Sequence, residues 1–483
     1  GGKGDESVTK LLKEKDVARR MAALRACDHP QAQFLWAIFR DAFHYVAVHL
    51  DTIADSARDI DFAMRWGYGW TTGPFEVWQS AGWQQIAQWV KEDIEAGHAL
   101  CSAPLPAWVF DGRSGVHGNE GSWSASQKRN LPKSDLPVYR RQAFRASLAG
   151  ETGNDARTAG VTVFEDEAVR LWHQNDDVLV FSMKTKMHVI GPQVIEGLNR
   201  AVALAEKDYQ GLVIWNTDAA DGGAFSAGAD LQAVLPLFMS GGVEAIGPVV
   251  HDLQQAYLGM RYAQVPVVAA VSGLALGGGC ELLLHADRRV AALESYIGLV
   301  EVGVGLVPAG GGLKEAARRA ALAAQGNDLL QFLKGNFINA AMANASKSAI
   351  EARAMGYLAA DDIIVYNPYE LLNVARSEVR AMSAAGYRPP LRRAFPVAGR
   401  YGIATIMAQL VNMRDGGFIS AHDYTLGAKI AEIVCGGDIQ PGSLVDEQWL
   451  LDLERRAFME LLNHPKTQER IMGMMQTGKP VRN

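Results

Sequence analysis

The sequence of 483 residues contains only four cysteines, and no two of them lie close together. Cys27, Cys101, Cys280 and Cys435 form no C-x-x-C pair, so neither a disulfide framework nor a zinc cage is expected. No apolar stretch reaches the length of about 18 residues that a membrane helix needs, and the polar first residues lack the apolar core of a signal peptide. We therefore predict a cytoplasmic protein without a membrane partner.

Positive charge is also in short supply. The chain has 47 Lys and Arg against 53 Asp and Glu, a formal net charge of -6, which provides no electrostatic footprint for nucleic acid. Hydrophobic residues make up 48%, which is ordinary for a folded protein and too high for disorder. The chain begins with Gly-Gly-Lys instead of Met, and we expect it to be a piece of a longer protein.

The first part of the chain has the pattern of a small all-helical domain, which we assign to residues 1–115. Apolar residues recur at helical spacing over 32–50, and shorter helices are predicted over 56–66 and 83–96. Residues 116–158 are rich in Gly, Ser, Asn and charge and show little periodicity, so we predict a linker there.

The pattern becomes mixed from residue 159 onward, which predicts an α/β core over 159–365. Strands are expected at 161–172, 178–182, 211–215 and 265–271, with a helix over 192–207. Strands that alternate with helices indicate parallel pairing through crossover helices. Helix predominates in the last part, 366–483, with a long amphipathic stretch around 443–463.

Three segments rich in small residues carry the strongest functional signal. They are Phe225-Ser-Ala-Gly-Ala-Asp-Leu231, Ser272-Gly-Leu-Ala-Leu-Gly-Gly-Gly-Cys-Glu-Leu282 and the segment 299–312. The first two follow predicted strands, where Gly and Ala let the backbone approach a ligand and turn its N–H groups toward it. Two such groups from separate loops are what an oxyanion hole requires.

Two carboxylates accompany these glycines. Glu281 follows the Gly run within the first turn of a predicted helix, and Glu301 follows an apolar run where a solvent-facing carboxylate is not expected. Two carboxylates around one water allow one to take a proton while the other gives one. The alternative is that the three segments are tight turns that pack helices on a sheet, with both Glu residues on the surface.

The three segments resemble the motifs of the crotonase (enoyl-CoA hydratase/isomerase) superfamily over roughly residues 159–483. The resemblance implies a ββα spiral domain with C-terminal helices, in which the N–H groups of Ala229 and Gly278 form the oxyanion hole. Glu281 would activate water and Glu301 would donate the proton. Two retained glutamates imply an enoyl-CoA hydratase, a lyase of fatty acid β-oxidation that adds water to trans-2-enoyl-CoA without a cofactor or metal. A Δ3-Δ2-enoyl-CoA isomerase, or a non-catalytic assembly module, is the alternative.

The same resemblance suggests where coenzyme A would bind and how the chain associates. Lys184 and Lys186 are candidates for contacts with its phosphates, and Ala227 and Asp230 lie in the first motif. The sequence departs from the family pattern at Gln232, where many members have Lys, and at Ala309, where hydratases usually have Gly. Crotonase-like domains commonly associate through their C-terminal helices, so a homo-oligomer is possible.

Residues 59–78 (DIDFAMRWGYGWTTGPFEVW) resemble the C-terminal helical domain of 3-hydroxyacyl-CoA dehydrogenases. Gly67, Gly69 and Gly73 imitate a dinucleotide fingerprint, but their spacing is G-x-G-x-x-x-G and no strand precedes them. The resemblance implies a fragment of a bacterial-type multifunctional β-oxidation enzyme whose NAD domain would come first. NAD would be needed only with that domain, and dehydrogenase activity is not expected from this chain alone.

Overall fold

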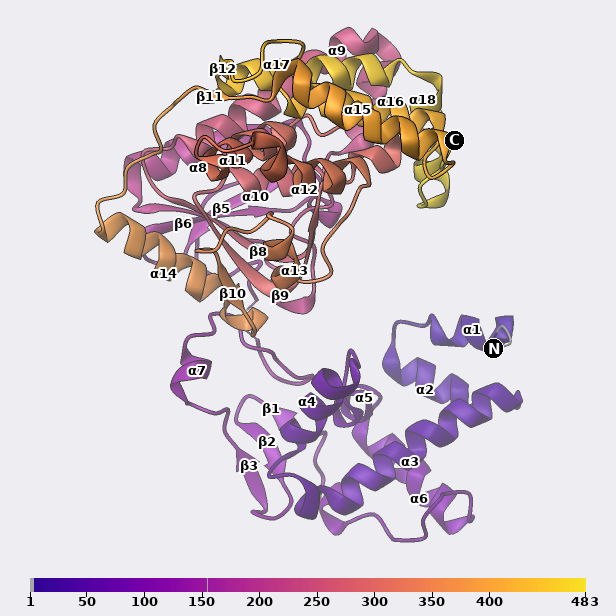
Figure 1. Ribbon diagram of the computed structural model, residues 1–483. Helices are drawn as coiled ribbons and strands as arrows, with labels where there is room; N and C mark the ends of the chain where they lie inside the picture. The colour runs from indigo at the N-terminus through magenta and orange to yellow at the C-terminus, as the bar shows by residue number, and fades with distance from the viewer. Residues whose placement is uncertain (1–3, 154) are drawn as a thin grey trace. The chain divides into compact units, whose positions relative to one another are not determined.

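The computed structural model describes residues 4–153 and 155–483 (Figure 1). They divide into two compact units. The first contains the described residues up to 140 together with 144–153, and the second contains 141–143 and the chain from 155 onward. None of the helices in these described residues is both long and apolar enough to cross a bilayer.

The first unit is mostly helical. Its helices are α1 (Glu6–Leu12), α2 (Val17–Ala26), α3 (Pro30–Ile53), α4 (Ala57–Tyr68), α5 (Pro74–Ser80), α6 (Trp83–Glu95), the 3-10 helix η1 (Ala107–Phe110) and α7 (Pro137–Arg140). The predicted helices correspond to α3, α4 and α6. Helix α3 begins at Pro30, which is favourable at a first helical position. It buries one stripe, which includes Trp36, Phe43 and Leu50, against α2, α5 and α6.

The first unit also contains a small antiparallel sheet, which corrects two predictions. Strands β1 (His117–Gly118), β2 (Gly121–Ser124) and β3 (Arg129–Leu131) lie within the predicted linker. Residues 116–140 and 144–153 therefore belong to the first unit, which is not all-helical and does not end at residue 115. The strands are two to four residues long, too short for their alternation to stand out in the sequence.

A buried polar cluster holds this sheet to the helices. The Asp61 carboxylate on α4 accepts hydrogen bonds from the N–H groups of Phe75 (2.9 Å) and Glu76 (2.9 Å) at the start of α5. Its Oδ2 lies 2.9 Å from Nε2 of His117, whose Nδ1 lies 2.8 Å from the Ser122 hydroxyl. The residues of the dehydrogenase-like segment thus anchor strands that the sequence assigned to a linker.

The second unit is built on a mixed sheet with helices on both sides. Its strands are β4 (Val161–Glu165), β5 (Val169–His173), β6 (Val178–Met183), β7 (Gly211–Ile214), β8 (Val267–Leu276), β9 (Arg288–Gly298), β10 (Ile363–Val365), β11 (Phe395–Pro396) and β12 (Leu444–Val445). Its helices are α8 (Pro192–Asp208), α9 (Leu231–Arg261), α10 (Gly278–His285), α11 (Gly312–Ala324), α12 (Leu329–Ala341), α13 (Ala349–Ala354), α14 (Leu371–Ala384), α15 (Gly399–Asp415), α16 (Ala421–Val434), α17 (Glu447–Leu462) and α18 (Pro465–Thr477). The 3-10 helices are η2 (Lys186–His188), η3 (Ala219–Asp221), η4 (Glu301–Val304) and η5 (Pro368–Glu370).

The main sheet has the strand order β10-β9-β8-β7-β6-β5-β4. Strands β6 to β10 pair in parallel, as predicted from the alternation of strands and helices, whereas β4, β5 and β6 are antiparallel. The stretch 161–172, expected as one run of strand, is divided between β4 and β5. The Asp166 side chain accepts from the N–H groups of Ala168 and Val169 and so forms the turn between them.

A second, shorter row of strands lies beside the main sheet. Strand β8 does not end at residue 271 as predicted but continues to Leu276, after a shift in register between Val271 and Gly273. The continuation pairs with the end of β9 on one side and bridges Ser226 on the other, and a further bridge joins Ile190 to Ala229. Successive β-β-α units thus supply one strand to each row, which agrees with the predicted ββα spiral of an α/β fold.

Helices cover both faces of the main sheet (Figure 1). Helix α14 packs on strands β6 to β9, while α8 and α10 pack on the other face. The C-terminal helices α15–α18 lie outside α10 and α11, and α17 contacts both α9 and α11. This arrangement brings a helix from the end of the chain next to the small-residue segments at 277–281 and 310–314.

The buried cluster around Asp61 predicts a large loss of stability on its removal. Asp61→Ala leaves two buried N–H groups and the His117 ring without an acceptor, which should lower the free energy of unfolding by about 2–4 kcal/mol. Urea unfolding followed by tryptophan fluorescence reports mainly on this unit, since eight of the eleven Trp residues precede residue 154. Asp55→Ala, at an exposed position, is the control and should change stability by less than about 0.5 kcal/mol. An equally small effect of Asp61→Ala would contradict the assignment.

Candidate active site

The first two small-residue segments lie side by side because both join the second row of strands. The Ser226 N–H donates to the Leu274 carbonyl oxygen (2.9 Å), and the Leu276 N–H donates back to the Ser226 carbonyl oxygen (3.0 Å). Each segment then turns into a helix, α9 after Asp230 and α10 after Gly277. Gly277 has a φ of 52°, a backbone conformation that favours glycine, which explains the Gly at this turn.

The N–H groups of Ala229 and Gly278 are adjacent at these two turns. A Cβ atom placed on Gly278 would lie 3.6 Å from the backbone nitrogen of Ala229. Neither N–H donates a hydrogen bond to another group in residues 4–153 and 155–483. Gly278 is the first residue of α10, where the helix dipole favours negative charge. The Tyr257 hydroxyl donates to the Gly278 carbonyl oxygen (2.9 Å) and so fixes the orientation of the peptide that follows.

Glu281 is buried in the first turn of α10, with 2% of its surface exposed. Its Oε1 accepts hydrogen bonds from the N–H groups of Gly310 (2.8 Å) and Gly312 (2.9 Å). A Cβ atom on Gly310 would lie only 2.5 Å from Glu281 Oε2, so this approach requires glycine. Burial raises the pKa of Glu281 to about 7, although the two N–H groups favour its ionised form.

Glu301 is the first residue of η4 and follows the end of β9 at Gly298 by three residues. Its Oε1 lies 3.1 Å from where a Cβ atom of Gly277 would be, so the carboxyl group is next to the turn that presents Gly278. Its Oε2 is buried and has no hydrogen-bond partner among the described residues. Burial, and then the charge of Glu281, raise the pKa of Glu301 well above its ordinary value.

The surroundings of the two glutamates favour different protonation states. Burial and the charge of Glu281 favour the neutral form of Glu301, whereas the two N–H donors to Glu281 favour its ionised form. Because the groups interact, the two protonation steps belong to the pair as a whole. One acid and one base beside two free N–H groups is an arrangement suited to moving protons near a carbonyl group.

The four residues predicted to bind coenzyme A differ in the contacts that they make in the structure. Lys184 donates to Glu165 (2.7 Å) and is engaged in that ion pair, while Lys186, in η2, is exposed and forms no ion pair with the described residues. Ala227 donates its N–H to the Met187 carbonyl oxygen (3.0 Å), which places η2 beside the first motif. The Asp230 side chain caps α9 by accepting from two N–H groups, both at 3.0 Å. Of the two lysines, Lys186 is thus the one without an ion-pair partner among the described residues, and the binding role of all four stays a prediction.

Sequence reasoning missed several residues that shape the site. Glu454 on α17 is fully buried and accepts hydrogen bonds from the N–H groups of Gly311 (2.8 Å) and Lys314 (2.7 Å). The Lys314 ammonium group is buried as well and contacts His285, Glu315 and Glu447. Glu447 and Glu454 lie in an amphipathic helix, where acidic residues are ordinary, so the sequence does not indicate that they are buried. Tyr257 was missed because its hydrogen bond to Gly278 depends on the tertiary fold.

Comparison with known proteins shows which family the second unit is similar to. Residues 174–347 match the sequence profile described as enoyl-CoA hydratase/isomerase. Residues 174–347 therefore form a domain that is similar to the enoyl-CoA hydratase/isomerase family. The crystal structure of an enoyl-CoA hydratase from Bacillus halodurans matches this chain with 17% sequence identity and a TM-score of 0.44. The match covers 63% of this chain and 99% of the Bacillus halodurans chain.

One curated relative extends the comparison beyond that domain, and a second matches a shorter stretch of the chain. A protein of Bacillus subtilis (strain 168) named "Probable 3-hydroxyacyl-CoA dehydrogenase" is 33% identical over 475 residues, which are 97% of this chain and 57% of that protein. A peroxisomal bifunctional enzyme of Cavia porcellus is 37% identical over 118 residues, 24% of this chain and 15% of that enzyme. The chain thus spans little more than half the length of the Bacillus subtilis relative, which combines both parts of the chain in one protein.

The raised pKa of Glu281 can be measured without any substrate. Infrared difference titration of the whole protein should show a buried carboxyl group that ionises near pH 7, and Glu281→Gln should abolish this step. Asp287, whose pKa burial raises to about 6, should keep its own step in that variant. Glu460→Gln, at an exposed position of α17, is the control. An unchanged step near pH 7 in Glu281→Gln would contradict the site described here.

Proposed function

We propose that the second unit is an enoyl-CoA hydratase that adds water to trans-2-enoyl-CoA in fatty acid oxidation. The observation that carries this proposal is the pair of carboxyl groups of Glu281 and Glu301, whose pKa values burial raises, next to two N–H groups without partners among the described residues. The family match does not distinguish a hydratase from an isomerase. The presence of both Glu281 and Glu301 supports hydration, which needs one group to take a proton and one to give a proton.

In the proposed reaction the thioester oxygen accepts hydrogen bonds from Ala229 and Gly278. These donors stabilise the negative charge that develops on the oxygen, an effect of about 3–4 kcal/mol per donor in comparable sites. Withdrawal of electrons from the conjugated double bond makes C3 electrophilic. Ionised Glu281 takes a proton from water as the water oxygen bonds to C3, and neutral Glu301 gives its proton to C2. The product is a 3-hydroxyacyl-CoA, and proton exchange with solvent restores both glutamates.

The alternative activity is migration of a double bond by a Δ3-Δ2-enoyl-CoA isomerase. One carboxyl group suffices to carry a proton between two carbons, and Glu301, with an oxygen free of hydrogen bonds, could do this alone. The backbone donors that orient Glu281 would then have no chemical role. A non-catalytic assembly module likewise would not need buried carboxyl groups with raised pKa values.

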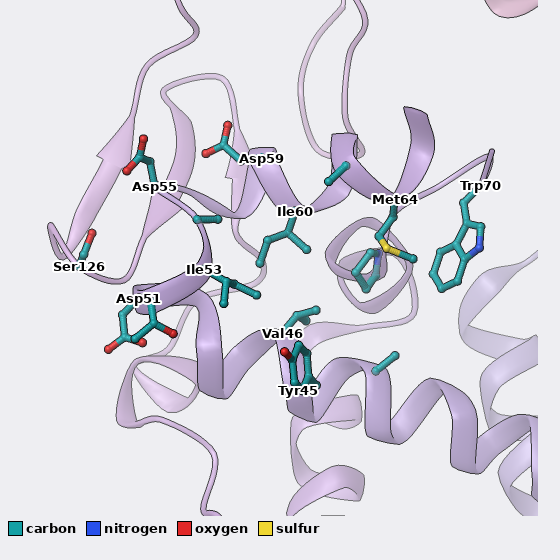
Figure 2. A pocket seen from close by; sticks show the side chains of 15 residues that line it. Tyr45, Val46, Asp51, Ile53, Asp55, Asp59, Ile60, Met64, Trp70 and Ser126 are labelled. Carbon is teal, nitrogen blue, oxygen red and sulfur yellow. The ribbon is translucent and has the colours of Figure 1, made fainter. Parts of the chain in front are cut away.

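The first unit has a cavity that is poorly suited to the same ligand. A volume of about 780 Å³ lies between α3 and α4 (Figure 2). Ile60, Met64 and Trp70 form an apolar part, whereas Asp51 and Asp55 give the other end negative charge. No Lys or Arg is among the residues that line it, so the phosphates of coenzyme A would be repelled. We therefore assign substrate binding to the second unit, and any NAD-dependent step to a domain outside this chain.

Substitution of either glutamate tests the proposed reaction. Glu281→Gln and Glu301→Gln should each lower kcat about 10²- to 10⁴-fold, because each removes a proton-transfer group, and KM should change only several-fold. The loss of the conjugated enoyl-thioester absorbance measures turnover, and Glu460→Gln is the control. Turnover near that of the wild type in either variant would overturn the assignment.

The pH dependence of kcat/KM provides a separate test. Glu281 must be ionised to accept a proton, so the rate should fall as the pH drops below about 7, the pKa of this group. Glu301 must be protonated, so a second decline should appear at higher pH, since its pKa is raised further. A rate that stays constant between pH 5 and pH 8, on the order of three pH units around that pKa, would contradict Glu281 as the base.

A further inference from the structure

Two buried glutamates share the N–H groups of one turn. The turn at residues 310–314 includes the first turn of α11, which begins at Gly312. The N–H groups of Gly310 and Gly312 donate to Glu281, whereas those of Gly311 and Lys314 donate to Glu454. Donors to the two carboxylates therefore alternate along the chain, so the same short backbone segment holds both glutamates.

Glu454 comes from a distant part of the chain. It lies on α17, more than 140 residues after the turn, and is fully buried. Helix α17 also contacts α9, where the Gln254 side chain donates to the Leu451 carbonyl oxygen (2.9 Å). A buried carboxylate is costly unless its oxygens are hydrogen-bonded, and here both oxygens of Glu454 accept from the turn.

We propose that Glu454 is a positioning residue for Glu281, which it orients through the shared turn at residues 310–314. This inference rests on the proposed hydratase function and extends it to the C-terminal helices. Glu454 makes no contact with the proposed reacting atoms. Its contribution is to fix the N–H groups of Gly310 and Gly312, and thereby the direction in which the Glu281 carboxylate faces.

Glutamine cannot replace Glu454 in this position without a change in the turn. The amide group of a glutamine side chain would offer one acceptor oxygen, and its NH₂ group would meet the second N–H of the turn donor to donor. Glu454→Gln keeps the size of the side chain, so the variant tests the hydrogen bonds separately from packing. Glu460→Gln on the same helix is the matched control, because Glu460 is exposed and pairs with Lys429.

The expected result for Glu454→Gln is a loss of kcat of about 10- to 100-fold, since a misplaced catalytic group has an effect of this size. KM for the enoyl-CoA should stay within about threefold. The key measurement is a double-mutant cycle. In the Glu281→Gln background, Glu454→Gln should lower kcat by less than about threefold, because the residue it positions is already gone. An equal loss in both backgrounds would overturn the proposal.

Infrared titration separates this inference from the proposed function. The titratable groups that face Glu454 are Glu281 on α10, Glu301 on η4 and Lys314 on α11, and burial, followed by the charge of Glu281, raises the pKa of Glu454 well above its ordinary value. Glu454→Gln should shift the carboxyl step near pH 7, which Glu281→Gln abolishes, and this readout needs no turnover. If the wild-type chain fails to hydrate enoyl-CoA while Glu454→Gln still shifts this step, the function is refuted and the positioning is supported. An unshifted step would refute the positioning.

A purely structural role for Glu454 predicts a different outcome. Glu454→Gln and Glu454→Asp would then lower the melting temperature below the assay temperature, and activity would be lost only with the fold. If both variants unfold in this way, the positioning role is rejected. If either keeps the melting temperature of Glu460→Gln and loses kcat as described, the role is supported.

Discussion

The burial of ionisable carboxyl groups against backbone N–H donors is the constraint on which the site depends. Glu281 and Glu454 are both inaccessible to bulk water, and each is tolerated because the turn at residues 310–314 supplies two N–H groups to it. The same burial raises the pKa of Glu281 to about 7. A glutamate exposed to water would be fully ionised at neutral pH, whereas the buried Glu281 can exchange a proton there.

The fold assembles this site through its second row of strands. The extension of β8 to Leu276 pairs with the segment at Ser226. These two segments then turn into α10 and α9, respectively, at adjacent positions. The free N–H groups at Ala229 and Gly278 follow from this pairing. Helix α17 joins the site from the C-terminal end, through the hydrogen bonds of Glu454 to Gly311 and Lys314. The site therefore draws on segments spread over more than two hundred residues, and each segment is held by backbone hydrogen bonds to its neighbour.

Much of this could be predicted from the sequence, because small-residue runs and strand-helix alternation are local patterns. The four residues expected to meet, Ala229, Gly278, Glu281 and Glu301, do lie next to the same turns. Two kinds of feature could not be predicted. The strands between 117 and 131 are too short to show alternation, so they looked like a linker. Glu454 resembles any acidic residue of an amphipathic helix, and only the tertiary fold shows that it is buried.

The most direct test of the account is the fate of water oxygen. The intact chain is incubated with a trans-2-enoyl-CoA in water enriched in oxygen-18, and the product is analysed by mass spectrometry. Hydration by the Glu281 and Glu301 pair predicts a 3-hydroxyacyl-CoA with the heavy oxygen at C3. An unlabelled acyl-CoA, either unchanged or with its double bond moved, would contradict the account.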